Sequence, residues 1–234
     1  MTTNSYTQTS LFTSLRKNIR EVVFKSPQLA RLYYRMTFSR PVLPHWVGNN
    51  YYRETSSWEL KPHLCPCDVD FMQYLEQEQI HNKTIFHFGT GSHHILGLEN
   101  RKLTAANQIL GITASVLEHQ KYVSLCQENR HLNKYYKVLF ADIYTLTAAA
   151  LPMFDIVSLF HLGEFYLTEE ADFVHHDDQS LVKMFLSKLN PGGRILFYPG
   201  SVGWGKVAEF IDKCEYQGKI HKVAEYNSLL VYQK

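Results

Sequence analysis

The chain has 234 residues and a formal net charge of +2, and its 45% hydrophobic and 14% aromatic residues allow a sizeable core. No apolar run reaches the about 18 residues that a membrane-spanning helix needs, and the polar start lacks the layout of a secretory signal. Four cysteines are too few for a disulfide framework in a chain of this length. We therefore expect a reducing, cytoplasmic setting.

The basic charge lies in the N-terminal part of the chain. Residues 1–60 hold eight Lys and Arg against three acids, a net +5, and the rest holds sixteen against nineteen, a net −3. Apolar residues recur at helical spacing over residues 10–38, and residues 39–67 are rich in Pro, aromatics, Asn and Ser. We predict two parts: a basic helical extension with its linker over 1–67, and a main domain over 68–234.

Three roles are open for the basic helices. They could close over a pocket as a lid, contact an anionic membrane surface or a partner protein, or bind nucleic acid. The lid ranks first. Nucleic acid ranks last, because no aromatic–basic motif accompanies the charge, and we do not expect a nucleic-acid partner. The sequence does not indicate an oligomeric state.

After a short amphipathic helix over 68–79, strands and helices alternate, which predicts a parallel sheet with right-handed crossovers. The predicted strands are 84–88, 108–113, 136–140, 155–160, 193–198, 219–226 and 228–233. Helices are expected between them at 93–102, 115–131, 178–189 and 203–213. The connection between the last two strands is too short for a crossover, so these two strands must pair antiparallel.

A glycine-rich turn follows the first strand. The apolar run ends at Phe88, and Gly89-Thr90-Gly91-Ser92 leads into a helix-like segment. Glycines let the backbone approach a ligand closely, and a helix N-terminus offers free N–H donors. Such a turn after a buried parallel strand is typical of nucleotide-like ligand sites, although ordinary strand–turn–helix corners also have this form.

Several landmarks together resemble the class I S-adenosylmethionine-dependent methyltransferases. They are FHFGTG at 86–91, FADIY at 140–144, MFDIVSLFHL at 153–162, LNPGGRILFY at 189–198 and the antiparallel last strand. The resemblance covers residues 70–234. It implies a three-layer Rossmann-like α/β sandwich with a seven-stranded, mostly parallel sheet. It also implies S-adenosylmethionine as the cofactor.

The resemblance assigns residues to that cofactor position by position. Gly89, Thr90 and Gly91 form the loop that admits the methionine part. Asp142 stands where the family accepts from the adenine amino group, with Ile143 beside the ring. The remaining residues implied at the cofactor are His87 at the end of the first strand, Thr113 at the end of the second and Phe160 after the fourth.

Three positions depart from the family pattern. His87 replaces the usual acid at the end of the first strand, and His93 replaces the third loop glycine. Thr113 replaces the acid that grips both ribose hydroxyls, and a neutral hydroxyl cannot make that charge-assisted pair. Glu118 is a candidate substitute. An acid introduced by Thr113→Asp is expected to strengthen cofactor binding.

Several histidines and cysteines are candidate metal ligands by residue type. His93, His94, His161 and the run His175-His176-Asp177-Asp178 match no metal spacing, and polar loop roles are preferred for them. His63-Leu64-Cys65-Pro66-Cys67 offers soft ligands in a short span, but no second pair is visible nearby, so unbridged structural thiols are preferred. No metal site is predicted.

Two functions follow from these residues. The first is methyl transfer to a small, aromatic or lipid-like molecule, because aromatic residues gather in 160–177 and in the linker. Oxygen or carbon is the expected acceptor atom, because SLFHLGEFY follows the fourth strand in place of the Asn/Asp-Pro-Pro-aromatic motif of amino-methylating enzymes. His161 is the predicted base, oriented by Glu164 three residues on, with Tyr166 as a lesser candidate. The second is a degenerate fold without methyl transfer, serving as a binding or scaffold protein or holding a metal through His161 and nearby histidines.

Overall fold

The structure is a computed structural model that describes residues 28–29, 32 and 57–234. The chain divides into two compact units, Met1–Asn50 and Tyr51–Lys234. Most of the predicted helices at 10–38 lie outside the described residues, as do the linker aromatics Trp46, Tyr51 and Tyr52. Residues 57–67, which the sequence placed with the extension, belong to the second unit. Within the part of the chain that the structure describes, no helix is both long and apolar enough to cross a membrane.

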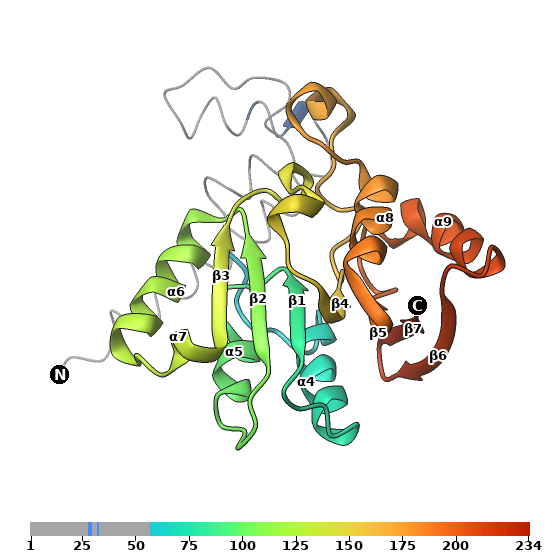
Figure 1. Ribbon diagram of the computed structural model, residues 1–234. Helices are drawn as coiled ribbons and strands as arrows, with labels where there is room; N and C mark the ends of the chain where they lie inside the picture. The colour runs from blue at the N-terminus through green and yellow to red at the C-terminus, as the bar shows by residue number, and fades with distance from the viewer. Residues whose placement is uncertain (1–27, 30–31, 33–56) are drawn as a thin grey trace. The chain divides into compact units, whose positions relative to one another are not determined.

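The second unit is a three-layer α/β sandwich around one seven-stranded sheet, and the predicted fold class is confirmed (Figure 1). The strand order is β3-β2-β1-β4-β5-β7-β6. In chain order the elements are α4 Cys67–Gln77, β1 Thr84–Phe88, α5 Ile95–Asn100, β2 Gln108–Thr113, α6 Val116–Glu128, α7 Leu132–Tyr135, β3 Tyr136–Phe140, η1 Ile143–Thr145, η2 Ala148–Ala150, β4 Phe154–Ser158, η3 Thr168–Phe173, α8 Asp178–Lys188, β5 Leu189–Phe197, α9 Trp204–Tyr216, β6 His221–Tyr226 and β7 Leu229–Gln233.

Strands β1 to β5 pair in parallel, and β7 pairs antiparallel with both β5 and β6, as predicted. The predicted ranges of β1, β2 and β3 match those observed. The LNPGG segment differs from its prediction, because α8 ends at Lys188 and β5 already begins at Leu189. Gly192 still takes a left-handed conformation, with φ +72°. Gly192 therefore does not cap α8. It lies within the first residues of β5, where the register with β4 is irregular.

Each face of the sheet carries its own core. One core packs α4, α5, α6 and α7 on one face, and it includes Phe71, Ile85, Tyr136 and Phe160. The other packs η1, α8 and α9 on the opposite face, around Phe86, Phe154, Phe185 and Phe197. Burying these faces orders the parallel strands and aligns their carboxyl ends at one edge, where the arrowheads of β1, β2 and β3 point in Figure 1.

Strands β1 and β4 are neighbours at the centre of the sheet. The strands that follow them, β2 and β5, lie on opposite sides of this pair, so the direction in which the chain adds strands reverses here. In open α/β sheets this reversal opens a crevice at the carboxyl ends of the two strands, and ligands bind there. The loop after β1 and the turn after β4 therefore form the candidate site.

Candidate functional site

The glycine loop after β1 is built for close approach. Gly89 and Gly91 have φ of +92° and +54°, a region that side chains with Cβ rarely adopt. Both glycines are contacted by the protein's own side chains. A methyl group built on Gly89 would lie 2.5 Å from Cδ2 of His161, and one built on Gly91 would lie 2.4 Å from Nε2 of His93. Two imidazole rings therefore rest on the loop.

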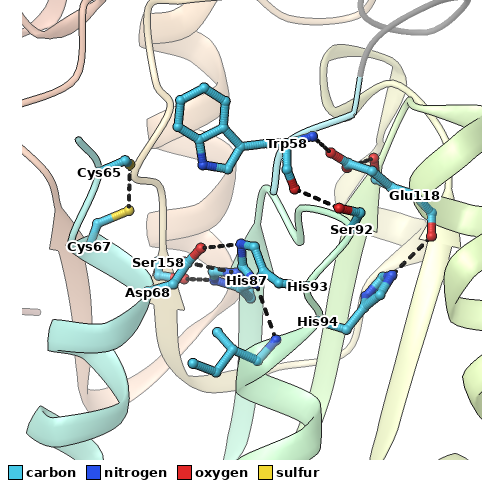
Figure 2. Close-up of polar contacts among 12 residues, drawn as sticks. Trp58, Cys65, Cys67, Asp68, His87, Ser92, His93, His94, Glu118 and Ser158 are labelled. Carbon is cyan, nitrogen blue, oxygen red and sulfur yellow. Dashed lines mark hydrogen bonds and ion pairs between the residues drawn. The ribbon is translucent and has the colours of Figure 1, made fainter. Parts of the chain in front are cut away.

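A buried carboxylate lies at the end of β2. Glu118 is fully buried, and its two oxygens accept from the Thr113 hydroxyl at 2.7 Å and from the Trp58 backbone N–H at 2.9 Å. The Trp58 carbonyl in turn accepts from the backbone N–H of Ser92 at 2.7 Å and from its hydroxyl at 2.9 Å. Figure 2 shows this chain of contacts, which joins the start of the unit to the loop after β1 and to α6.

The end of β3 presents Asp142 and Ile143 at the same edge. Asp142 is 8% exposed, and its Oδ1 accepts from the backbone N–H of Tyr144 at 3.0 Å, which caps the η1 turn. Ile143 is 2% exposed and packs into the core. A capping carboxylate at this place agrees with the local sequence, because Asp commonly accepts from the backbone two residues on.

Two histidines surround a buried carboxylate next to the loop. The Asp68 carboxylate lies 3.4 Å from Nε2 of His87 and 3.3 Å from Nε2 of His93 (Figure 2). His87 also shares a 2.8 Å hydrogen bond with Ser158, its register partner on β4. Burial lowers the pKa of His87 to about 4, so this ring is neutral at physiological pH. Burial raises the pKa of Asp68, but the hydrogen bond to His93 and the charges of His87, His93 and His161 together outweigh it, and the net shift is downward.

His94 supports the loop from below. It takes a left-handed conformation, with φ +45°, at the N-cap of α5. Its Nδ1 lies 3.0 Å from the Tyr136 hydroxyl and its Nε2 lies 2.9 Å from the Glu118 carbonyl oxygen. Burial lowers its pKa to about 4. His94 thus ties β3 and α6 to the loop as a structural residue.

A second pair of contacts lies on the turn after β4. Nδ1 of His161 lies 3.3 Å from Oε1 of Glu164, and the same oxygen accepts from the Ser201 hydroxyl at 2.6 Å. Burial lowers the pKa of His161, but the hydrogen bond and charge of Glu164 outweigh it and raise the pKa to about 9. The ring is therefore a cation at neutral pH, and a base role requires it first to lose that proton.

Two thiols adjoin this turn. The Sγ atoms of Cys65 and Cys67 lie 3.4 Å apart, and together with a ring nitrogen of His161 they form a group of ligand atoms within 4.8 Å of one another. The hydrogen bond from Cys67 lowers the pKa of Cys65 to about 7 although burial opposes it, and the same bond raises the pKa of Cys67. The contact between the two thiols therefore favours ionisation of Cys65 over that of Cys67.

The structure brings some predicted site residues together and separates others. Gly89, Thr90, Gly91, His161 and Glu164 gather at the carboxyl ends of β1 and β4, and Tyr166 lies farther along the same segment against Tyr144. Their roles stay predictions. The Thr90 hydroxyl is buried and has no hydrogen-bond partner within the described ranges.

Phe160 requires a correction. It is fully buried, and its ring meets Phe71 and His87 edge-on in the core beneath α4, so it is a packing residue and has no access to a ligand at the edge. His87 is likewise enclosed, with 1% of its surface exposed. His87 is enclosed because both faces of its strand β1 are covered, and Phe160 is enclosed because the turn after β4 packs its ring against Phe71 of α4.

Two features escaped the sequence analysis. Trp58 contacts Glu118 and Ser92 through its backbone N–H and carbonyl oxygen, and contacts of backbone atoms cannot be predicted from the residue type. Cys65 and Cys67 meet His161 rather than the neighbouring His63, which is exposed. The Cys-x-Cys pair was the available signal, but its partner lies far along the chain, on the turn after β4.

No protein-family model matches the chain, and no curated protein matches it. Solved structures do. N-methyltransferase NodS from Bradyrhizobium japonicum, in complex with S-adenosyl-L-homocysteine, shares 12% identity with a TM-score of 0.48, over 72% of this chain and 86% of that one. An O-methyltransferase family protein from Burkholderia thailandensis shares 13% with a TM-score of 0.48, over 73% and 56%. The [4+2]-cyclase SpnF shares 21% with a TM-score of 0.42, over 60% and 49%.

The chain thus spans about half the length of some of these proteins. At these identities the likeness concerns the fold alone. The fold itself is that of the class I methyltransferases, because the strand order β3-β2-β1-β4-β5-β7-β6 with an antiparallel β7 is present in this chain.

The residues at the carboxyl ends of the strands fit only one half of S-adenosylmethionine, the cofactor that this fold implies. The nucleoside half fits, because Glu118 supplies a buried carboxylate beside Thr113 and Asp142 lies at the end of β3. The methionine half does not fit in this arrangement, because the rings of His161 and His93 lie against Gly89 and Gly91. The residues at the ends of β2 and β3 therefore favour cofactor binding, whereas the side chains around the glycine loop oppose it in this arrangement.

Proposed function

We propose that the protein is an S-adenosylmethionine-dependent methyltransferase that acts on oxygen or carbon of a small molecule. The observation that carries this proposal is the Glu118 carboxylate at the end of β2, which holds two hydrogen-bond donors. Ribose hydroxyls are donors of the same kind, and a carboxylate can bind both with charge assistance. Glu118 therefore takes the part that the sequence first gave to Thr113.

Other residues support the nucleoside end. Gly89 and Gly91 take positive φ and carry no side chain of their own, and the unpartnered Thr90 hydroxyl between them offers a further polar atom on the loop. When bound, S-adenosylmethionine would supply an electrophilic methyl group. The chain's own part would be to hold the nucleoside through Glu118 and Asp142.

An aromatic or lipid-like acceptor is part of the proposal. Phe165 lies beside the loop, with its ring centroid 6.1 Å from that of Phe88 and 6.4 Å from that of His161. These rings give the segment after β4 an apolar wall suited to a planar or acyl group. All four cysteines are free thiols, which supports a reducing, cytoplasmic setting.

Calorimetry with S-adenosylhomocysteine tests the proposal. We expect micromolar binding by the parent chain and about tenfold or greater weakening in Glu118→Gln, because the charge-assisted bonds to the ribose are lost. Glu128→Gln, an exposed acid on the same helix, is the matched control and should bind like the parent. Absence of binding at millimolar ligand contradicts the proposal.

The second candidate is a methyltransferase fold that no longer transfers methyl groups. The specific observation in its favour is the pair of imidazole rings on the glycine loop. His93→Ala separates the two candidates, since removing this ring clears the space above Gly91. If the parent and His93→Ala both fail to bind S-adenosylhomocysteine, this second candidate replaces the first.

A further inference from the structure

Three soft or borderline ligands converge at the end of β4. Cys65 and Cys67 flank Pro66 at the start of α4, and His161 lies on the turn that follows β4. One ligand atom from each residue lies within 4.8 Å of the others. Cys67 is fully buried and Cys65 is half-buried, so the group is largely enclosed by protein rather than lying on an open surface.

The spacing of the sulfurs matches a shared metal ion. Tetrahedral zinc with Zn–S bonds of about 2.3 Å places two sulfur ligands about 3.8 Å apart. The two Sγ atoms are 3.4 Å apart here, a shift of a few tenths of an ångström from that value. A disulfide would need the sulfurs at about 2.05 Å, so the pair is much closer to a metal-ligand separation than to a covalent bond.

The surroundings of His161 supply what a metal-binding histidine needs. Ligating histidines almost always use their second ring nitrogen to contact a carboxylate, which fixes the ring orientation. Nδ1 of His161 faces Oε1 of Glu164 at 3.3 Å, and the Ser201 hydroxyl donates to the same oxygen at 2.6 Å. Nε2 is thereby left as the ligand atom.

The turn that carries His161 is fixed by backbone packing. A methyl group built on Gly163 would lie 2.4 Å from the carbonyl oxygen of Gly203, so only glycine permits this approach. The Asp178 carboxylate accepts from the backbone N–H of Gly163 at 2.9 Å, and Lys206 donates to the carbonyl oxygen of Gly163 at 2.9 Å. The histidine is therefore positioned before any ion binds.

We propose that Cys65, Cys67 and His161 bind one Zn²⁺ ion, with Glu164 as the carboxylate that orients His161. Three protein ligands leave a fourth coordination position for water or for an oxygen or sulfur of an acceptor, which is the arrangement of catalytic rather than structural zinc. Ligation through Nε2 and the Glu164 contact at Nδ1 would use both ring nitrogens. The zinc site would therefore replace the general-base role predicted for His161.

Metal analysis of the full chain, purified without a histidine tag from zinc-containing medium, tests the site. We expect one zinc per chain in the parent and loss of stoichiometric zinc in Cys65→Ser, Cys67→Ser and His161→Ala. Cys126→Ser on α6 and His221→Ala on β6 are matched controls that should keep the metal, because neither residue belongs to the group.

Cobalt gives a readout that needs no variant to fold. Parent protein loaded with Co²⁺ should show a thiolate-to-cobalt charge-transfer band and the visible bands of a tetrahedral site. Glu164→Gln should keep these bands but bind zinc about 10–100-fold more weakly. Zinc absent from the parent together with no thiolate–cobalt band overturns the proposal, as does full zinc retention in both cysteine variants. Calorimetry with S-adenosylhomocysteine is independent of these results, so either proposal can fail alone.

Discussion

The two halves of the candidate site share one sheet edge but are built differently. At the ends of β2 and β3, single carboxylates hold neutral donors, as Glu118 holds Thr113 and the Trp58 backbone. At the ends of β1 and β4, histidines, thiols and acids contact one another, and the rings of His93 and His161 lie on the loop glycines. The first half holds carboxylates that accept from neutral donors, while the second half is filled by ionisable side chains. A shared fold therefore does not carry a shared site, because strand order fixes where a crevice forms and not which side chains fill it.

The largest effect is expected on the histidine side. Gly89→Val forces a branched residue into φ +92° and places its Cβ against His161. Backbone strain should cost about 1–3 kcal/mol of unfolding free energy, and crowding against the His161 ring should add about 1–3 kcal/mol more. Urea denaturation followed by circular dichroism measures it.

Gly205→Ala in α9 is the control for that substitution, since its Cβ would meet nothing within 4 Å. It should stabilise the protein by about 0.5–1 kcal/mol because glycine is a poor helix former. A Gly89→Val protein as stable as the parent would mean that Gly89 neither holds this left-handed conformation nor lies against His161 in solution.

On the nucleoside side, a smaller effect is expected from Thr113→Asp. The sequence predicted tighter cofactor binding, but the Thr113 hydroxyl lies 2.7 Å from the Glu118 carboxylate, so a second acid there would meet a like charge. We now expect weaker binding of S-adenosylhomocysteine than in the parent and a loss of stability of about 1–3 kcal/mol. Thr113→Ser keeps the hydroxyl and should match the parent in both measurements. Tighter binding by Thr113→Asp would show that Glu118 does not occupy this place.

The smallest effect concerns Asp155, which lies near the amino end of β4, away from the candidate site. It accepts from the backbone N–H and hydroxyl of Thr84 and from Asn190. Burial raises its pKa, but these bonds outweigh burial and lower the pKa below its usual 3.8. Its contribution to stability is therefore present above pH 3.8 and is lost as the pH falls through the lowered folded value.

Asp155→Asn should accordingly be less stable than the parent by up to about 1 kcal/mol at neutral pH, with the gap closing in acid. Thermal unfolding at several pH values measures this gap, and Asp212→Asn, an exposed acid on α9, controls for the loss of one charge. A gap that stays constant down to acid pH would mean that the carboxylate charge of Asp155 contributes nothing.

The sequence predicted the sheet well because the signals for strands are local. Three strand ranges match those observed, and the antiparallel ending follows from the short turn at Asn227, which adopts φ +49°. The site was less predictable because its contacts are long-range and partly made by backbone atoms. Trp58 and Glu118 meet although they are 60 residues apart. Phe160 was misplaced for a different reason, since β4 ends at Ser158 and the turn that follows packs this ring against Phe71 of α4, a long-range contact that the local sequence does not indicate.

The most direct test of the account is a crystal structure of the full chain grown with millimolar S-adenosylhomocysteine. The account predicts ligand at the carboxyl edge of the sheet, with ribose hydroxyls on the Glu118 carboxylate and the Trp58 N–H released from it. Crystals in which the Trp58–Glu118 bond is intact and no ligand lies at the ends of β1 to β3 would contradict it.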